Sequence, residues 1–380
     1  MRLMIFQPSK SAYDVLTDFS SKLHQAFVTL DACQSTLYVP GQSKYASDEW
    51  IDHHQITHIF GFNGVSMTVS LNKAHEDIPH FGWLVDYPVY HYGRLSSSLP
   101  NKLIFSANQQ HRHYISTLTN STYVDSLSLG ATYSGADIQH PLNERDFDVV
   151  FIGGWMGEPE PLWEKSPEPI VKKIANETLA VLMADDNADV FLTLEKKFKQ
   201  YGISLERNID LINVLARYLE NYLRKYLRLK MMRSIVQSGL KTLVVGSGWS
   251  EHFAGDHMYF HEPVNNEFIN EIYKHCKLAI CLNSNNGGCE RALQALASGC
   301  VVFSFGGMAI EQLALDNKNI NISPSHLSEK NIAIQLKQLH EQVMAHSSHL
   351  PKPEFSAHEH SWLSVAERLM HAMQTTEVIN

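Results

Sequence analysis

The sequence has little of what a membrane-spanning, secreted or nucleic-acid-binding protein needs. No apolar run in its 380 residues approaches the roughly 20 residues of a membrane-spanning helix. Residues 1–7 combine one basic residue with a short apolar run, which is typical of a first β-strand rather than of a signal peptide. The net charge of −9 argues against non-specific nucleic-acid binding. We therefore expect a cytoplasmic protein with no integral membrane segment and no nucleic-acid partner.

Cysteine and metal-binding motifs are scarce too. The five cysteines (33, 276, 281, 289 and 300) form an odd set without a close metal-type pair, and most lie in one apolar stretch where free cysteine behaves as a small hydrophobe. The 21 histidines form neither an HExxH motif nor a spaced cluster with cysteines. A zinc site is therefore not expected, and the thiols should be reduced.

What is present is an alternation of short apolar runs with helical spacing, which predicts β-α-β units and a parallel sheet. In the first part of the chain the candidate strands are Leu3–Gln7, Ala26–Leu30, His58–Phe62, Phe81–Val85, Lys102–Ser106 and Thr122–Ser126. The sequence then turns polar and restarts at Asp148–Trp155 with a buried strand that leads into a diglycine turn. This restart is typical of a second Rossmann-like domain.

We accordingly predict two Rossmann-like α/β domains that face each other across a cleft. The first covers 1–145 and the second 146–350, with a helical insertion at about 159–238. Residues 351–380 should form a C-terminal helix that packs back on the first domain.

The most informative stretch runs from Asn283 to Gly307, directly after the apolar run Lys277–Leu282. An apolar strand is followed by a turn at Asn285–Gly288, a helix at Glu290–Ala297, a glycine cap and a second apolar strand. Asparagine and glycine accept positive φ and let a ligand approach the backbone. Because a loop of unpaired amides at a helix N-terminus attracts anions, this β-α-β unit could hold a nucleotide diphosphate or serve only as a tight turn.

The first domain offers polar residues at two strand exits. One strand ends in Asn63 and a second in Asp86 and Tyr87, with His91 close behind. Ligands of open α/β sheets bind outside the carboxyl ends of strands, so these four are candidate cleft residues.

Four segments in order resemble the GT-B glycosyltransferases and, within them, the CgeB-like (spore-maturation-type) family. They are Trp83–Pro88 (W-x-x-D-x-P), Leu127–Ala131 (L-P-L-G-A, with serine for proline), Asp148–Gly154 (D-V-x-F-I-G-S) and Gly287–Gly299 (G-x-x-x-R-x-x-E-x-x-A-x-G). The resemblance implies a nucleotide-sugar donor bound by the second domain and no cofactor. The implied donor site comprises Gly153, Gly154, Gly248, Asn286, Gly287, Gly288, Arg291 and Gln294.

The sequence also departs from this family. Many related transferases carry two glutamates eight positions apart on the last segment, and here Asn286 and Gln294 stand in their places. An amide at 294 still offers a donor and an acceptor to ribose hydroxyls. Asn286 supplies no charge, so the anomeric outcome stays open.

Asp86 is our candidate general base, because deprotonation of an acceptor hydroxyl needs a carboxylate or an imidazole within hydrogen-bond reach. A turn-capping role is the alternative for Asp86. His91 is the second catalytic candidate and His111 a further alternate, while Asn63 and Tyr87 are assigned to acceptor binding.

Metal-independent transfer is expected, since the D-x-D pattern at 146–148 precedes a strand instead of following one. Helix N-termini and basic side chains would then neutralise the leaving group. The basic stretch within 222–230 predicts a solvated helix face, with an anionic acceptor or peripheral membrane contact as the alternative.

The predicted function is transfer of a sugar from a nucleotide-diphosphate donor to a hydroxyl acceptor, such as a surface glycan or a protein like flagellin. The acceptor rests on family analogy alone. Two alternatives stay open: an epimerase of the same fold acting on the donor without an acceptor, and a binding or scaffold protein that has lost catalysis.

Overall fold

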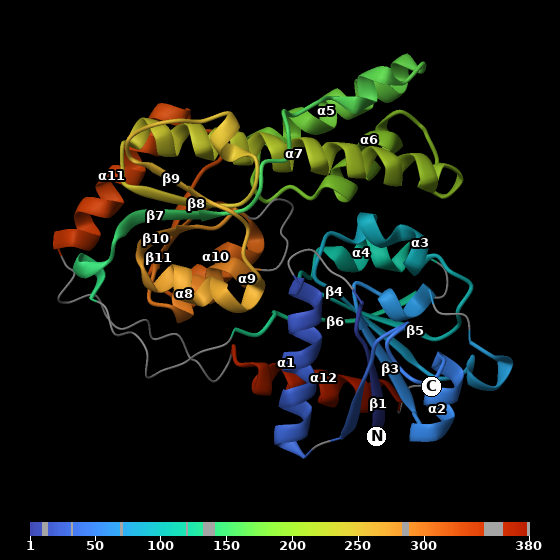
Figure 1. Ribbon diagram of the computed structural model, residues 1–380. Helices are drawn as coiled ribbons and strands as arrows, with labels where there is room; N and C mark the ends of the chain where they lie inside the picture. The colour runs from blue at the N-terminus through green and yellow to red at the C-terminus, as the bar shows by residue number, and fades with distance from the viewer. Residues whose placement is uncertain are drawn as a thin grey trace. The chain divides into compact units, whose positions relative to one another are not determined.

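A computed structural model describes residues 1–9, 14–31, 33–68, 71–118, 121–131, 141–282, 289–345 and 360–377. The chain forms two compact units (Figure 1). One contains Met1–Thr132, Asn265–Glu267 and Ser356–Asn380, and the other contains Tyr133–Val264 and Phe268–Phe355. Each is a Rossmann-like unit built on a six-stranded parallel sheet, so the predicted fold class of two such domains is confirmed.

The sheet of the first unit has the strand order β2-β1-β3-β4-β5-β6. The strands are β1 (Arg2–Phe6), β2 (Gln34–Tyr38), β3 (His58–Phe62), β4 (His80–Leu84), β5 (Lys102–Ser106) and β6 (Ser121–Ser126), and the α-helices are α1 (Val15–Leu30), α2 (Ser47–His54), α3 (Tyr92–Leu95), α4 (His111–Ser116) and α12 (Trp362–Glu377). The order reverses between β1 and β3, which is the topological switch point of such a sheet.

One strand prediction was wrong here, and one strand was missed. Ala26–Leu30, predicted as a strand, is the last part of α1, and the second strand of the unit is Gln34–Tyr38 instead. The apolar residues at 26–27 continue a helical stripe with Phe19 and Leu23, spaced three or four positions apart on the buried face of α1. The edge strand β2 carries mostly half-buried polar residues, so it gives no apolar run.

The core of the first unit joins α1, the sheet and α12. Trp362 lies 5.5 Å from Phe19, ring centre to ring centre, and both belong to the cluster that lines the sheet. A Cβ atom at Gly130 would lie 2.8 Å from the Trp362 ring, so glycine is required for this packing. The Leu127–Ala131 segment, singled out from the sequence, thus contributes two buried leucines and the seat for α12.

The sheet of the second unit has the order β12-β11-β10-β7-β8-β9. Its strands are β7 (Phe147–Ile152), β8 (Thr242–Val245), β9 (Met258–His261), β10 (Cys276–Ile280), β11 (Val301–Phe305) and β12 (Ile320–Ser323). Read from β9, this is the 3-2-1-4-5-6 order of nucleotide-binding α/β sheets, with the switch point between β7 and β10. The helices outside the insertion are α8 (Ile269–Lys274), α9 (Glu290–Ala297), α10 (Met308–Asp316) and α11 (Glu329–Ala345).

The second unit carries the helical insertion, made of α5 (Pro169–Ala184), α6 (Val190–Gln200) and α7 (Ile209–Ser238). The C-terminal half of α7 buries Met231, Met232 and Ile235 against the sheet, while its N-terminal half extends to α5 and α6 beyond the sheet (Figure 1). The helix ends at Gly239, whose φ of +65° suits a left-handed cap. One continuous helix therefore joins the insertion to the core.

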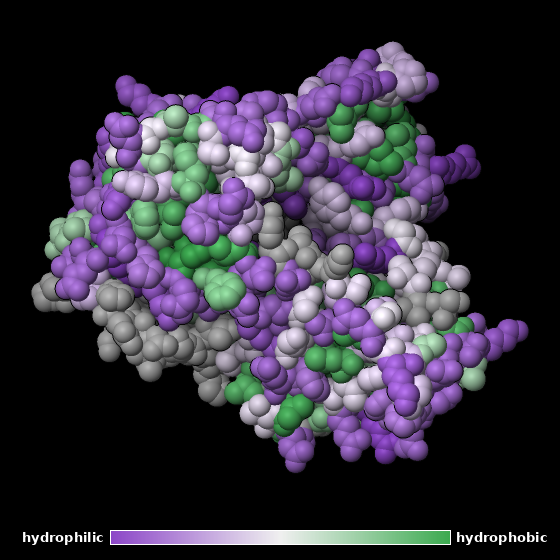
Figure 2. Space-filling view, in the orientation of Figure 1, coloured by the Kyte–Doolittle hydropathy of each residue, from purple (hydrophilic) through white to green (hydrophobic). Residues whose placement is uncertain are grey.

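The exposed surface is mixed in character. Figure 2 shows polar residues over most of the visible face and apolar residues gathered in smaller areas, some of them over the insertion. Within the described ranges, no helix is both long and apolar enough to cross a membrane.

Candidate active site

In the first unit, Asn63 connects the exits of two neighbouring strands. It follows β3 with a φ of +53°, and its amide nitrogen donates to Asp86 Oδ2 at 2.7 Å. Its side-chain oxygen accepts from the backbone N–H groups of Val85 and Asp86 at 3.0 and 3.3 Å. Because β3 borders the switch point, Asn63 orients the Asp86 carboxylate at the edge where ligands bind.

His91 and Arg94 complete this group. The Arg94 guanidinium donates to the Asn63 carbonyl at 2.9 Å and reaches His91 Nδ1 at 3.4 Å. An imidazole nitrogen that accepts from arginine is unprotonated, so the neutral ring carries its proton on Nε2, 3.9 Å from Asp86 Oδ2. The pKa of His91 is lowered to about 4, mainly by burial. The negative charge of Asp86 acts to raise this pKa, and the positive charge of Arg94 acts to lower it further.

These facts separate the two catalytic candidates. His91 is neutral at pH 7 and buried, and its basic nitrogen faces Arg94. The Asp86 side chain is 54 % exposed, so a substrate hydroxyl can reach its carboxylate. Of the two candidates, Asp86 has the more accessible group, and the assignment of either residue to catalysis stays a prediction.

Tyr87 is a buried residue. Its side chain is 4 % exposed, and its ring meets the buried His111 ring edge-on at 5.3 Å. The structure thus brings Asn63, Asp86 and His91 together and packs Tyr87 against His111.

In the second unit, the diglycine turn follows β7 at the switch point. The Gly153 carbonyl accepts from Trp249 Nε1 at 2.6 Å. A Cβ at Gly246, whose φ is +150°, would lie 2.4 Å from the Gly153 carbonyl oxygen, so only glycine allows the β8 exit to approach this closely. Gly248, with a φ of +83°, packs against Trp155 in the same way. Close backbone packing therefore fixes the shape of the turn.

A cationic group lies against this turn. Arg228 of α7 donates to the Gly154 carbonyl at 3.1 Å. Its pKa is lowered to about 10, mainly by burial and further by Arg224 and Arg291, with Glu220 opposing. Among the described residues whose charges act on Arg228, Arg224 pairs with the fully buried Glu220 at 2.7 Å, so the net charge of this group is positive. Such an excess at a switch point attracts an anion.

Helix α9 supplies the remaining donor candidates. Arg291 donates to the side-chain oxygen of Gln294 at 3.1 Å, and Gln294 is 4 % exposed. The predicted helix bounds of Glu290–Ala297 are confirmed. Asn286, Gly287 and Gly288 lie outside the described residues.

The D-x-D carboxylates have other partners. Asp148 accepts from Lys277 at 2.7 Å and contacts His340 at 2.9 Å, and these hydrogen bonds hold its pKa well below the usual range despite its burial. Asp146 pairs with His275 at 3.0 Å. Among the described residues, no group of three or more histidine, cysteine, aspartate or glutamate side chains could hold a metal ion.

Sequence reasoning missed Arg94, Arg224 and Arg228. A weak signal existed for the last two, because arginines four positions apart share one helix face. The surrounding basic stretch resembles a solvated face, however, and the main partner of Arg228 is a backbone carbonyl that no motif records.

Comparison with known proteins defines the fold. No family model matches the chain, and no curated protein matches it either. Among solved structures, it is similar to AviGT4, a glycosyltransferase of avilamycin A biosynthesis (9% identity, 98% of this chain, 97% of that one, TM-score 0.53). It is also similar to sucrose-phosphate synthase from Thermosynechococcus elongatus (10% identity, 100% of this chain, 100% of that one, TM-score 0.53). A third similar structure is that of WaaG, a glycosyltransferase of lipopolysaccharide biosynthesis (9% identity, 97% of this chain, 98% of that one, TM-score 0.53).

At this level of identity the likeness shows the architecture. The chain has the GT-B fold of these enzymes, with two Rossmann-like parallel-sheet units. The CgeB-like family assignment stays a prediction.

Proposed function

We propose that this chain is a metal-independent glycosyltransferase that moves a sugar from a nucleotide-diphosphate donor to a hydroxyl acceptor. The observation that carries the proposal is the unbalanced positive charge of Arg228 beside the diglycine turn at the switch point. A diphosphate bound at this turn would contact two cations, Arg228 and Arg291, and the backbone of the tight turn. The glycosyltransferases of the same fold add support by analogy.

The residues of the first unit supply the acceptor chemistry. In the proposed reaction, the acceptor hydroxyl loses its proton to Asp86 while its oxygen bonds to the anomeric carbon of the donor. The bond from that carbon to the diphosphate breaks, and its electrons leave with the nucleotide. Asn63 holds the carboxylate by its hydrogen bond of 2.7 Å, and Arg228 with Arg291 stabilises the departing charge. A surface glycan or a protein such as flagellin is the proposed acceptor.

Nucleotide binding tests the donor half of the proposal. Thermal unfolding is measured with UDP-, GDP- and TDP-sugars, and with CMP-sugars as the monophosphate comparison, and we expect one of the diphosphate sugars to raise the melting temperature. Arg291→Ala should weaken that binding about 10- to 150-fold, the effect of losing one charged hydrogen bond. A protein that no nucleotide stabilises would be a scaffold rather than a transferase.

Product analysis tests the reaction. We expect transfer only when an acceptor is present, and conversion of the nucleotide sugar alone would reveal an epimerase. Asp86→Asn should leave nucleotide affinity unchanged and lower turnover by roughly 10²–10⁴, the usual contribution of a general base. Full activity in Asp86→Asn would refute the assignment of the base.

A further inference from the structure

Helix α7 buries one carboxylate that the proposed reaction does not use. Glu220 is fully buried, and Arg224, one turn further along α7, contacts its Oε1 with Nε at 2.9 Å and with Nη2 at 2.7 Å. One more turn leads to Arg228, which donates to the Gly154 carbonyl at the diglycine turn. Because side chains four positions apart are neighbours on a helix, these three form a row with one negative and two positive charges.

The charge of Glu220 reaches the group at the turn. Burial lowers the pKa of Arg228 most; among the charges that act on it, Arg224 and Arg291 lower it further and Glu220 raises it. A buried charge is screened much less than an exposed one, so Glu220 acts over the length of two helical turns. These three arginines and one glutamate have a net charge of +2.

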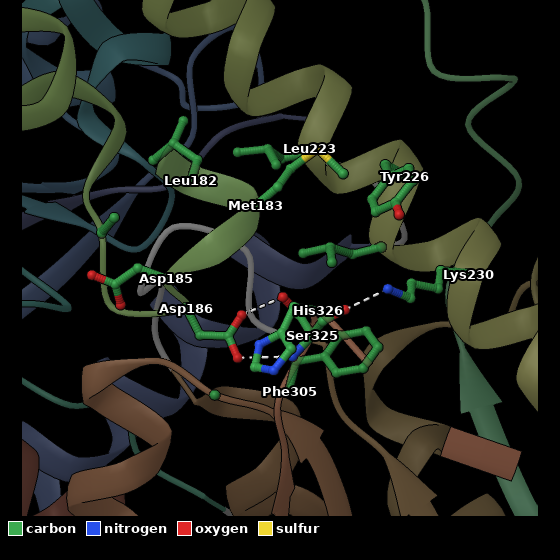
Figure 3. A pocket seen from close by; sticks show the side chains of 13 residues that line it. Leu182, Met183, Asp185, Asp186, Leu223, Tyr226, Lys230, Phe305, Ser325 and His326 are labelled. Carbon is green, nitrogen blue, oxygen red and sulfur yellow. Dashed lines mark hydrogen bonds between the residues drawn. The ribbon is translucent and has the colours of Figure 1, made fainter. Parts of the chain in front are cut away.

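The next charged residue of α7 is bound elsewhere. Asp186, Tyr226 and Lys230 line a cavity between the insertion and the exits of β11 and β12 (Figure 3). There Lys230 donates to the Ser325 carbonyl at 2.5 Å, and Asp186 accepts from the Ser325 N–H at 2.8 Å. Because Lys230 and Asp186 bring opposite charges to the same residue, they add no net charge to the group at the turn.

The charge at the turn affects substrate and product differently. The diphosphate of a nucleotide sugar carries two negative charges. When its bond to the anomeric carbon breaks, the terminal phosphate of the product gains nearly one more, because the second pKa of such a phosphate is about 6. Each positive charge added at the turn would therefore strengthen the binding of the product more than that of the substrate, and slow release of a product can limit turnover.

We propose that Glu220 is a positioning residue for product release: it holds the Arg224 guanidinium, cancels its charge and so limits the affinity of the site for the leaving nucleoside diphosphate. The helical insertion, to which this part of α7 belongs, thereby tunes the donor site. The inference rests on the proposed function, because it requires that a diphosphate binds at the diglycine turn.

Charge variants test the proposal by calorimetry with UDP, GDP and TDP and with their hexose conjugates. Glu220→Gln adds one net positive charge and should raise the affinity for the diphosphate that binds about tenfold, the effect of a unit charge over about 12 Å at an effective dielectric constant of about 20. Arg224→Gln should lower that affinity by a similar factor. The affinity for the hexose conjugate should change less in both variants.

The double variant Glu220→Gln/Arg224→Gln separates charge from structure. It restores the net charge, so its affinity should return to about the wild-type value, whereas a purely structural pair would weaken binding in all three variants. The differences should also shrink when salt is raised from about 0.05 to 0.5 M. Glu195→Gln is the matched control, because Glu195 is buried too and pairs with Lys199, four positions later on α6, at 2.8 Å; it should leave nucleotide affinity unchanged.

Melting temperatures verify that the variants fold. Should Glu220→Gln unfold, the step from Arg224→Gln to the double variant removes the same carboxylate and should raise the affinity about tenfold. If a nucleoside diphosphate binds to wild type but removal of Glu220 leaves its affinity unchanged or lowers it, the role of Glu220 is overturned and the proposed function stands. If no nucleotide binds to any of these proteins, both are overturned.

Discussion

Replacing Arg228 by glutamine should weaken nucleotide binding without lowering the stability of the free protein appreciably. Its guanidinium is mostly buried beside two other arginines, and its pKa falls from 12.5 to about 10. At about 1.4 kcal/mol per pH unit, keeping this group charged costs on the order of 3 kcal/mol. Because pH 7 lies well below 10, the group stays protonated and the cost applies throughout the neutral range.

The hydrogen bond to Gly154 offsets much of that cost. A hydrogen bond from a charged donor contributes about 1.5–3 kcal/mol, and glutamine is too short to replace it fully. Without ligand, Arg228→Gln should therefore change the free energy of unfolding by less than about 1 kcal/mol, or should increase it. Nucleotide affinity should nevertheless fall about 10- to 150-fold, because the guanidinium binds the negatively charged diphosphate in the proposed complex.

The assay is thermal unfolding with and without the nucleotide that binds, followed by calorimetry. Arg233→Gln is the matched control, since Arg233 lies on the same helix, is 49 % exposed and faces Glu329 at 3.6 Å. Its loss should affect neither quantity. If Arg228→Gln destabilises the free protein by more than about 3 kcal/mol and leaves nucleotide affinity intact, the arginine is a structural residue and our reasoning fails.

Three further changes test the structure elsewhere. Hydrogen bonds to Asp48 and Asp52 raise the pKa of His75. The stabilisation by His75 is therefore full below about pH 6.5 and is lost as the pH rises through the raised pKa. In urea unfolding, the difference in stability between wild type and His75→Gln should shrink from pH 6 to pH 8, and a constant difference would contradict this. Gly246→Ala should lower the free energy of unfolding by at least about 2 kcal/mol through clash and strain and should weaken nucleotide binding. Gly239→Ala, at a positive φ in open space, should lower it by about 1 kcal/mol. Equal losses would show that Gly246 does not approach the diglycine turn closely. Arg145→Met should lower the free energy of unfolding by about 3 kcal/mol or more, because three buried carbonyls lose a charged donor and the thiol of Cys300, a weak donor, contacts only two of them. A melting temperature within a degree or two of wild type would refute that role.

The sequence determined the elements whose signal is local. His58–Phe62 and Lys102–Ser106 were predicted with their observed bounds, because a strand buried on both faces is a continuous apolar run. Asn63 and Asp86 could be expected to meet, since the exits of parallel strands share one edge of a sheet. The sequence misled at Ala26–Leu30, where an apolar cluster belongs to the buried face of a helix.

Only the tertiary structure decided which charged side chains matter at the candidate sites. Arg94 and Arg228 donate to backbone carbonyls 31 and 74 positions away in the chain. Every residue has a backbone carbonyl, so the sequence does not indicate which one an arginine will contact. The cavity beside Asp186 likewise exists because the insertion folds back onto the exits of β11 and β12. Strand and helix formation depends on neighbours in the chain, whereas burial, like-charge proximity and cavity shape depend on residues that only folding brings together.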